Sequence, residues 1–309
     1  MEKQIVFQSH HLTKTYKQFK ALDEVSMTIY EGDIYGFVGE NGAGKTTLIR
    51  LACSLSLPTS GEYSLFGVSS KDKEIYNEKR KISAIVESVS INKNLNALCN
   101  LKVQCMIAGI KRSDDELNQI LEDVGLDLES IKNKKAASFS LGMRQRLGLA
   151  IALISEPKFV LLDEPMNGLD PQGFVDMRET ILRLNKKGVT FLISSHILSE
   201  LEKICTRVGF LSRGRLLTEL SIEELHRKAR RKIVIRVNEA SKINGELIKT
   251  LNIKESEVQG DFITIYDLVD VNDVMSYLVK NNINILSIST SEDTIEDYYR
   301  KIMSVEVVL

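Results

Sequence analysis

The sequence predicts an α/β protein that combines a parallel core sheet with a helical subdomain and ends in a small α+β domain. Three observations support this fold class. A strand, a glycine-rich loop and a helix follow one another along residues 34–57. Leu and Ile recur at helical spacing between about 87 and 155, and apolar strand runs return at 159–162 and 189–194. Beyond residue 231, short strands and helices alternate again.

Length and composition fit a protein with one large domain and one smaller domain. The chain has 309 residues, of which 43% are hydrophobic and 27% are charged. Its 41 Lys and Arg nearly balance 42 Asp and Glu, whereas a dedicated nucleic-acid binder normally carries a basic excess. The four cysteines form no C-x-x-C pair, so we expect packed thiols in a reducing cytosol rather than a zinc site or a redox motif.

We expect no part of this sequence to enter a membrane. It opens without the apolar stretch of a signal peptide. The longest apolar runs, such as 147–154, are far too short to span a bilayer. Any membrane role must therefore come through a partner.

The first elements lead to the glycine-rich loop. Residues 5–7 predict a short apolar strand, and residues 25–29 alternate in hydrophobicity as a half-buried strand does. Residues 34–38 are mostly apolar, which favours a buried parallel strand. A helical pattern then runs from 45 to 57 and ends at Pro58.

A helical insert and three more strands complete the first domain, which we assign to residues 1–220. The insert spans about 87–155, because β-branched strand runs disappear there. Strands are predicted at 159–162, 189–194 and 208–212. Because helical stretches separate these strands, the sequence favours a parallel core sheet.

We assign residues 221–309 to the small second domain, after a boundary near 219–231. Strands are predicted at 233–237, 262–266 and 283–288, and helices at 243–251, 271–279 and 294–303. The basic run 226–232 lacks an apolar stripe and favours a solvated linker between domains. Contact with anionic lipid headgroups is the alternative.

The strongest chemical signal is a phosphate-binding loop that fits G-x-x-x-x-G-K-[ST]. It reads Gly39-Glu40-Asn41-Gly42-Ala43-Gly44-Lys45-Thr46-Thr47. The glycines let successive backbone amides approach phosphate oxygens, and the helix that follows adds its positive end. We expect Lys45 to reach the β- and γ-phosphates of ATP and the Thr46 hydroxyl to bind Mg²⁺. The alternative interpretation is a glycine-rich turn that binds no ligand.

Two carboxylates end the strand predicted at 159–162. Asp163 suits Mg²⁺, directly or through water. Glu164 is the natural general base for attack by water on the γ-phosphate. An acid pair after a strand is common at surfaces, but its combination with the phosphate-binding loop predicts an ATPase.

The segment 138–146 lies between these two motifs and reads Ser-Phe-Ser-Leu-Gly-Met-Arg-Gln-Arg. It resembles the signature of the ATP-binding cassette (ABC) family at Ser140 and Gly142. The resemblance implies a cassette fold with a parallel core sheet, an antiparallel β part and the helical subdomain. It also implies a homodimer, in which the signature of one subunit contacts the ATP held by the other. A Ser-capped helix start is the structural alternative.

Further resemblance to the family extends through the first 220 residues. Tyr16 stands where the family places an aromatic ring that stacks on adenine, and its alternative is a packed surface tyrosine. Asp170, in Asn-Gly-Leu-Asp, is similar to the loop at the dimer seam. His196 is similar to the family's switch histidine, which implies contact with the γ-phosphate and with Glu164.

One departure concerns Glu87, which stands where the family usually has a glutamine at Mg²⁺. Leu141 and Met143 also depart from the commonest signature. These features, and the ending at 291–299, resemble the subgroup that serves bacitracin export and lantibiotic self-protection.

The resemblance implies the energy subunit of a transporter, bound at the cytoplasmic face of the membrane to a separate transmembrane permease. Its cofactors would be ATP and Mg²⁺, and nucleic acid would not be a partner. An ABC ATPase acting on the ribosome or DNA is the alternative, which a single contiguous cassette of balanced charge disfavours. The second domain is expected to be an accessory module, and control of the ATPase by ligand sensing or dimerisation is one hypothesis for it.

Overall fold

The computed structural model describes residues 3–87, 90–228, 231–266, 269–292, 298, 299 and 302. The chain divides into two compact units, Met1–Ile222 and Glu223–Leu309, and each is described by itself. The sequence predicts the domain boundary between residues 220 and 221. Within the part of the chain that the structure describes, no helix has both the length and the apolar character needed to cross a bilayer.

An antiparallel sheet opens the first unit. Its strands are β1 (Ile5–Tyr16), β2 (Phe19–Tyr30), β4 (Ser60–Leu65) and β5 (Val68–Ser69), in the order β2-β1-β4-β5. The strands predicted at 5–7 and 25–29 exist but are longer, so those predicted bounds are wrong. β1 continues through polar residues because they alternate with buried ones such as Ser9 and Leu12, and because β2 and β4 pair with both of its edges.

The core sheet carries the strands that hold the predicted site. Its order is β10 (Arg215–Ser221), β9 (Arg207–Ser212), β3 (Ile34–Val38), β8 (Thr190–Ser195), β7 (Phe159–Asp163) and β6 (Ile82–Ile85). The strands β9, β3, β8, β7 and β6 run parallel, and β10 pairs antiparallel with β9. Every residue of β3, β7 and β8 is buried, which explains why these strands are the clearest in the sequence.

Several helices connect the strands of the first unit. They are α1 (Lys45–Ala52), α2 (Ile75–Glu78), α7 (Pro171–Lys186) and α8 (Leu198–Glu202). A further helix, α9 (Ile222–Lys228), follows β10, and all of its residues after Ile222 belong to the second unit. The prediction that α1 reaches residue 57 is wrong, because the chain turns at Ser54, whose φ is 59°. The sequence analysis did not predict α7, although Asp170 caps it and Pro171 occupies its first position.

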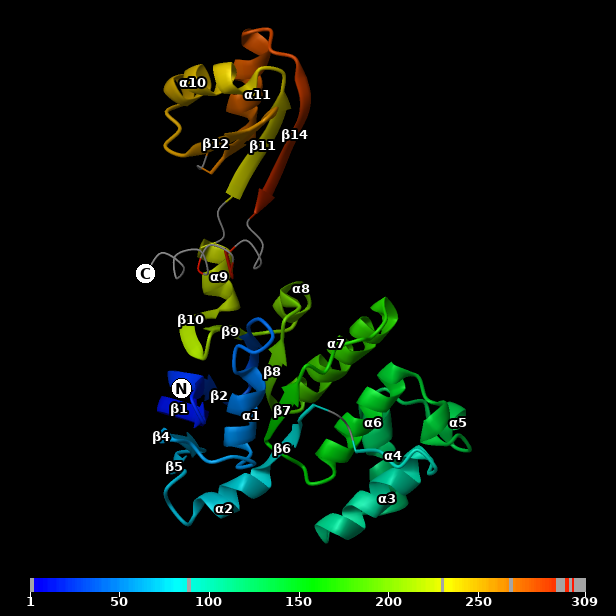
Figure 1. The fold of residues 1–309 in the computed structure, drawn as a ribbon. Coiled ribbons are helices and arrows are strands. Elements are labelled where there is room, and N and C mark those ends of the chain that lie inside the picture. Colours follow the sequence, from blue (N-terminus) through cyan, green and yellow to red (C-terminus); the bar gives the residue numbers. More distant parts are fainter. Residues whose placement is uncertain are drawn as a thin grey trace. The chain divides into compact units, whose positions relative to one another are not determined.

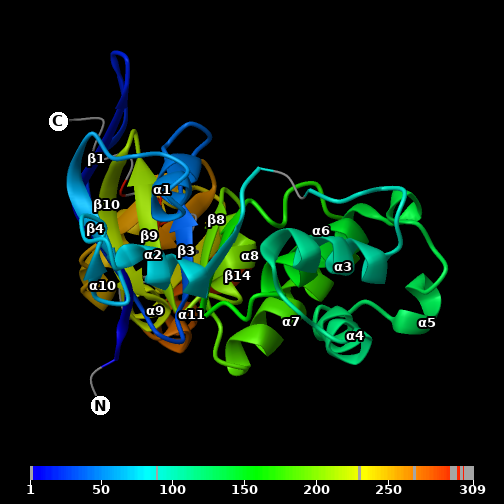
Figure 2. The same cartoon turned by 90° about the horizontal axis from the view of Figure 1, so that it is seen from below.

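The helical subdomain contains α3 (Ala97–Ala108), α4 (Asp114–Asp123), α5 (Leu128–Ile131) and α6 (Leu141–Leu153). These four helices gather beside the core sheet, in cyan to green in Figures 1 and 2. Local signals start several of them. At α4, the Ser113 hydroxyl accepts from the backbone N–H of Glu116, and the Glu116 carboxylate accepts from the N–H of Ser113.

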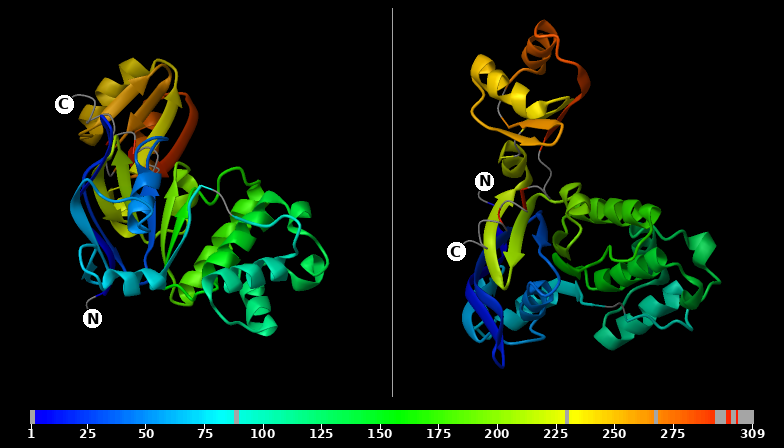
Figure 3. Two further views of the ribbon diagram at one scale, coloured as in Figure 1. Left: turned by 60° about the horizontal axis from the view of Figure 1, so that its bottom comes forward. Right: turned by 45° about the horizontal axis from the view of Figure 1, so that its top comes forward.

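The second unit is a four-stranded antiparallel sheet with two helices. Its elements are β11 (Arg231–Val237), α10 (Ala240–Leu251), β12 (Ser256–Gln259), β13 (Phe262–Ile265), α11 (Val271–Lys280) and β14 (Ile285–Glu292). The strand order β12-β13-β11-β14 is that of a ferredoxin-like fold. Buried Ile235, Leu247 and Leu278 belong to one hydrophobic core. Figure 3 shows the strands and helices of this unit in yellow to red. The helix predicted at 294–303 lies mostly outside the described residues.

Candidate functional site

The glycine-rich loop connects β3 to α1 in a conformation that needs glycine. Gly44 precedes α1 with φ 111°, and a Cβ there would lie 2.4 Å from the carbonyl oxygen of Ala21. A Cβ on Gly39 would lie 2.5 Å from the carbonyl oxygen of Leu211. Gly42 has φ 82° but open space around it. The loop therefore folds tightly because its close neighbours are backbone atoms that side chains would displace.

Lys45 is buried in the centre of the loop. Its Nζ donates to the carbonyl oxygens of Gly39 at 2.6 Å and Glu40 at 3.1 Å. The same Nζ lies 3.2 Å from Oε1 of Glu164. An ammonium held this way by the loop itself is placed to meet an anion that enters the loop.

The other loop residues occupy the first turn of α1 and the exposed rim. Asn41 is exposed, whereas Thr47 is half-buried. Ala43 is buried, and its carbonyl oxygen accepts from the N–H of Gly214 at 2.9 Å. This bond ties the loop to the turn between β9 and β10.

Asp163 and Thr46 come together although 117 residues separate them. The Thr46 hydroxyl donates to Oδ2 of Asp163 at 2.7 Å, while Oδ1 of Asp163 accepts from the Ser194 hydroxyl at 2.6 Å. Asp163 and Ser194 are register partners at the carboxyl ends of β7 and β8. The buried carboxylate is thus held on both oxygens by hydroxyl groups from neighbouring elements.

Glu164 follows with a left-handed backbone, φ 49°, which turns its side chain out of the strand direction. Its Oε2 lies 2.8 Å from Nδ1 of His196, and its Oε1 faces Lys45. Its backbone N–H donates to the hydroxyl of Ser194 at 3.0 Å. The predicted base, switch histidine and loop lysine therefore form one connected cluster.

Ser194 is the member of this cluster to which the sequence analysis gave no role. It is completely buried, and its hydroxyl connects the Asp163 carboxylate to the Glu164 backbone. The signal in the sequence is a polar residue directly after the apolar stretch Phe191–Ile193 of β8. Only the pairing of β8 with β7 shows what this hydroxyl contacts.

Ser140, Gly142 and Asp170 lie together at a second place on the first unit. The Ser140 hydroxyl caps α6 by accepting from the N–H of Met143 at 3.1 Å, and Asp170 caps α7 by accepting from the N–H of Gly173 at 3.0 Å. A Cβ on Gly142 would be 3.7 Å from Leu169, the neighbour of Asp170. The helix-cap alternative thus describes their contacts within one chain.

Tyr16 and Glu87 lie at the edges of the site. Tyr16 is 42% exposed, with the Lys14 ammonium 4.9 Å from its ring centroid. Glu87 forms an ion pair with Arg50 of α1 at 2.5 Å. The structure thus gives Glu87 a cationic partner, whereas Thr46 and Asp163 bond to each other.

A metal site made wholly of side chains is not found among the described residues, because no three His, Cys, Asp or Glu side chains gather there. The Thr46 hydroxyl and the Asp163 carboxylate are nevertheless hard oxygen donors of the kind that Mg²⁺ accepts. Mg²⁺ commonly binds through one or two such groups together with phosphates of a substrate. The pair therefore fits Mg²⁺ that arrives with a nucleotide.

Comparison with known proteins identifies the family. A family model described as ABC transporter matches residues 22–167. The bacitracin transport ATP-binding protein BcrA of Bacillus licheniformis is 39% identical over 303 residues, covering 96% of this chain and 97% of that protein. The chain belongs to the ABC transporter family. It is an ATP-binding subunit, and the activity that this membership gives it is ATP hydrolysis coupled to transport.

Other comparisons agree with the ABC assignment. The lantibiotic transport ATP-binding protein SrtF of Streptococcus pyogenes is 40% identical over 209 residues, covering 68% of this chain and 88% of that protein. A solved ATP-binding cassette, in a dimeric post-hydrolysis state bound to ADP and Pi, superposes with a TM-score of 0.61 at 25% identity. It covers 70% of this chain and 98% of that one. The resemblance and the cassette fold inferred from the sequence are thus confirmed.

Proposed function

We propose that this ABC subunit hydrolyses MgATP between two copies of itself and powers export of a peptide antibiotic, or self-resistance to one, through a separate permease. The substrate class rests on relatives that are named for bacitracin and lantibiotic transport. The similarity to BcrA extends over both units of the chain. A relative that shared only the cassette would support ATP hydrolysis but would say less about the cargo.

In this proposal the loop 39–47 binds the phosphates of ATP, and Tyr16 stacks on adenine. Thr46 and Asp163 would hold Mg²⁺, which when bound neutralises phosphate charge and polarises the bond that is cleaved. Ser194 holds Asp163 in place through its 2.6 Å hydrogen bond. Lys45 leaves the loop carbonyls to meet the phosphates, because a charged partner bonds more strongly than a neutral carbonyl.

Glu164 is the proposed base that takes the proton of the attacking water. Its carboxylate lies between the Lys45 ammonium and the His196 ring, at 3.2 and 2.8 Å. This arrangement is the single observation that carries the mechanism, because it places a carboxylate between two groups that can stabilise charge on the γ-phosphate. His196 orients the carboxylate and, with Lys45, stabilises the transition state.

The site requires a second copy, because Ser140, Gly142 and Asp170 cap and pack elements of their own subunit rather than joining the cluster around Lys45. The amino end of α6 offers backbone amides and a hydroxyl to a phosphate held by the partner copy. A dimeric cassette bound to ADP and Pi is among the similar structures, which supports this assembly.

A groove of about 520 Å³ between β6 and the helical subdomain is the proposed place for the permease. Val86, the neighbour of Glu87, lines it, and Leu55 on its wall is 68% exposed. Met106 and Ile107 of α3 are neighbours in sequence and are 81% and 74% exposed, and adjoining exposed apolar side chains are typical of an interaction surface. Glu87 would then lie between the nucleotide and the permease, at the cytoplasmic face of the membrane.

The test of the catalytic assignment is Glu164→Gln in the full chain. We expect MgATP to bind with unchanged affinity and hydrolysis to fall at least about 100-fold, because the change removes a proton acceptor and keeps the shape. Glu122→Gln, an exposed change on α4, is the matched control and should retain wild-type turnover. Wild-type turnover by the Glu164 variant would refute the assigned base.

The test of the cargo is resistance of cells that carry the chain with its permease. We expect resistance to bacitracin or a lantibiotic with the wild-type chain and sensitivity with Glu164→Gln. Equal sensitivity of both strains to these peptides would reject the proposed substrate class without contradicting the assignment as an ATPase.

A further inference from the structure

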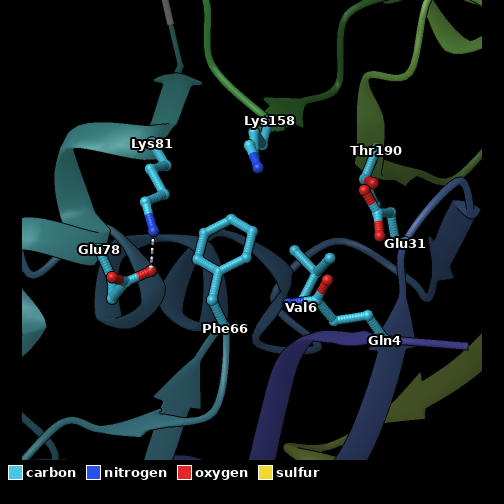
Figure 4. Close-up of a pocket in the computed structure, with 8 residues that line it drawn as sticks. All are labelled: Gln4, Val6, Glu31, Phe66, Glu78, Lys81, Lys158 and Thr190. Atoms are coloured by element: carbon cyan, nitrogen blue, oxygen red, sulfur yellow. Dashed lines mark hydrogen bonds and ion pairs between the residues drawn. The ribbon is translucent and has the colours of Figure 1, made fainter.

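A second cavity lies in the first unit, away from the nucleotide site. It has a volume of about 140 Å³, and the side chains of Phe66 and Val6 form its apolar floor (Figure 4). Lys158 immediately precedes β7, Glu31 precedes β3, and Thr190 begins β8. These are the amino ends of parallel strands, whereas Asp163 and Ser194 lie at the carboxyl ends. The cavity therefore lies at the amino ends of the core strands, opposite the ends that carry Asp163 and Ser194.

Two of the four charged groups that line this cavity neutralise each other. The Lys81 ammonium pairs with the Glu78 carboxylate at 2.6 Å and lies 5.4 Å from the centroid of the Phe66 ring. Figure 4 shows this pair on one side of Phe66. A ligand would have to displace Glu78 to use Lys81, so this pair contributes little to charge recognition.

The other two charged groups, Lys158 and Glu31, have no such partner. In the described part of the chain, neither the Lys158 ammonium nor the Glu31 carboxylate makes an ion pair or a hydrogen bond. Figure 4 shows Lys158 above Phe66 and Glu31 beside Thr190, with the apolar floor between them. The cavity thus presents one positive and one negative group across an apolar surface.

We propose that this cavity binds a free α-amino acid with an apolar side chain. The carboxylate of the ligand pairs with Lys158, its ammonium pairs with Glu31, and its side chain packs on Phe66 and Val6. A simple anion leaves Glu31 unpaired beside it, and a simple cation leaves Lys158 unpaired. A zwitterion satisfies both groups, and its apolar side chain covers the floor that Phe66 and Val6 form.

The test is isothermal titration of the nucleotide-free full chain with L-leucine and L-phenylalanine up to about 10 mM, a range that reaches weak millimolar binding. The comparison ligands are N-acetyl-L-leucine, which lacks the positive charge, L-leucinamide, which lacks the negative charge, and inorganic phosphate. We expect saturable binding of both amino acids and affinity at least about tenfold lower for each comparison ligand, since each loses one charged contact.

Variants assign the contacts. Lys158→Gln and Glu31→Gln should each weaken leucine binding about tenfold, while the exposed controls Lys111→Gln and Glu122→Gln leave it unchanged. In Lys158→Gln, leucinamide should bind as well as leucine, because the lost charge has no partner left. Binding of MgATP shows that each variant is folded, since none of these residues contacts the nucleotide site.

Several outcomes would overturn the proposal. They are no binding of either amino acid by folded protein, equal or tighter binding of phosphate or acetyl-leucine, and leucine affinity unchanged in Lys158→Gln. None of these outcomes bears on ATP hydrolysis, so the proposed function stands or falls separately.

Discussion

Ser194 shows how a single hydroxyl can organise the catalytic cluster. It donates to Asp163 at 2.6 Å and accepts from the backbone of Glu164 at 3.0 Å. Glu164 has a backbone conformation that non-glycine residues rarely adopt, so something must hold it there. The hydroxyl therefore holds the Asp163 carboxylate directly and, together with the Ser194 carbonyl oxygen, holds the backbone of Glu164.

The substitution Ser194→Ala should reduce kcat for ATP about tenfold or more and raise the Mg²⁺ concentration needed for half-maximal activity. Loss of the hydroxyl leaves one oxygen of buried Asp163 without its donor, whereas the Glu164 N–H keeps its bond to the Ser194 carbonyl oxygen at 3.2 Å. Steady-state ATPase assays at varied Mg²⁺ measure both effects. Thermal unfolding should show that the free energy of unfolding falls by about 1–2 kcal/mol.

Ser195→Ala is the matched control for this prediction. Ser195 is also buried, but its hydroxyl accepts from the N–H of Ile197 in its own segment. We expect its Mg²⁺ requirement to equal that of the wild type. If Ser194→Ala and Ser195→Ala lose activity equally and keep the wild-type Mg²⁺ requirement, the proposed role of Ser194 is wrong.

The thiols of half-buried Cys53 and buried Cys205 give a pH prediction. Burial raises the pKa of Cys53 from 9.0 to about 12, and burial also raises the pKa of Cys205. Because the folded pKa lies above the unfolded value of 9.0, the neutral Cys53 thiol contributes its full stabilisation of the folded state below pH 9.0, and this contribution is lost as the pH rises toward about 12. At pH 7.5 the thiolate fraction of Cys53 is below about 10⁻⁴, since each pH unit changes it tenfold.

We therefore expect iodoacetamide to alkylate Cys53 and Cys205 at least about 100-fold more slowly in the native protein than in guanidinium chloride. The native rate at Cys53 should rise about tenfold per unit between pH 7 and 9. Peptide mass spectrometry of timed samples measures each site. A native rate equal to the unfolded rate would contradict the burial of these side chains.

At the scale of single elements, the glycine-rich loop separates two causes of glycine preference. Gly42 and Gly44 both have positive φ, at 82° and 111°. Only Gly44 is also crowded, since its Cβ would meet the Ala21 carbonyl and the Leu22 side chain. The start of α1 therefore depends on a close backbone approach as well as on backbone freedom.

Gly44→Ala should destabilise the first unit by at least about 2 kcal/mol more than Gly42→Ala, because both substitutions add backbone strain but only the first adds a clash. Urea unfolding of the two variants measures the difference. Equal losses of stability would show that the approach of Ala21 is not what demands glycine at 44.

At the scale of the whole molecule, each unit has a hydrophobic core of its own. The first core includes Phe7, Phe37 and Phe159, and the second includes Ile235 and Leu278. The residues of the proposed nucleotide site all belong to the first unit of the chain. Each core can therefore be tested without altering the other.

Calorimetry of the full chain should show two transitions, of which only one shifts to higher temperature when MgATP is added to the Glu164→Gln variant. Leu278→Ala truncates a fully buried side chain. It should lower the free energy of unfolding of the second unit by about 3 kcal/mol and shift the other transition to lower temperature. Its MgATP affinity should stay unchanged. One transition that responds to both changes would contradict the independence of the two cores.

The sequence by itself determined the family, the loop 39–47 and the acid pair Asp163 and Glu164. These features are local. Glycines that allow a tight turn, and a lysine or carboxylate that suits phosphate or metal, stand within a few residues of one another and form a recognisable motif. The buried strands were equally clear because a strand covered on both faces is apolar throughout. The local pattern predicts only the first part of β1, because exposed polar side chains interrupt the buried ones along this strand.

Tertiary structure alone decided which distant residues meet. The Thr46–Asp163 bond, the bridge through Ser194 and the cavity between Lys158 and Glu31 all follow from the strand order β3-β8-β7-β6. That order also places Lys158 and Glu31 near the amino ends of β7 and β3, where neither meets a charged partner among the described residues. The physical reason is that strand order and register are set by packing of the whole core, which no short stretch of sequence encodes.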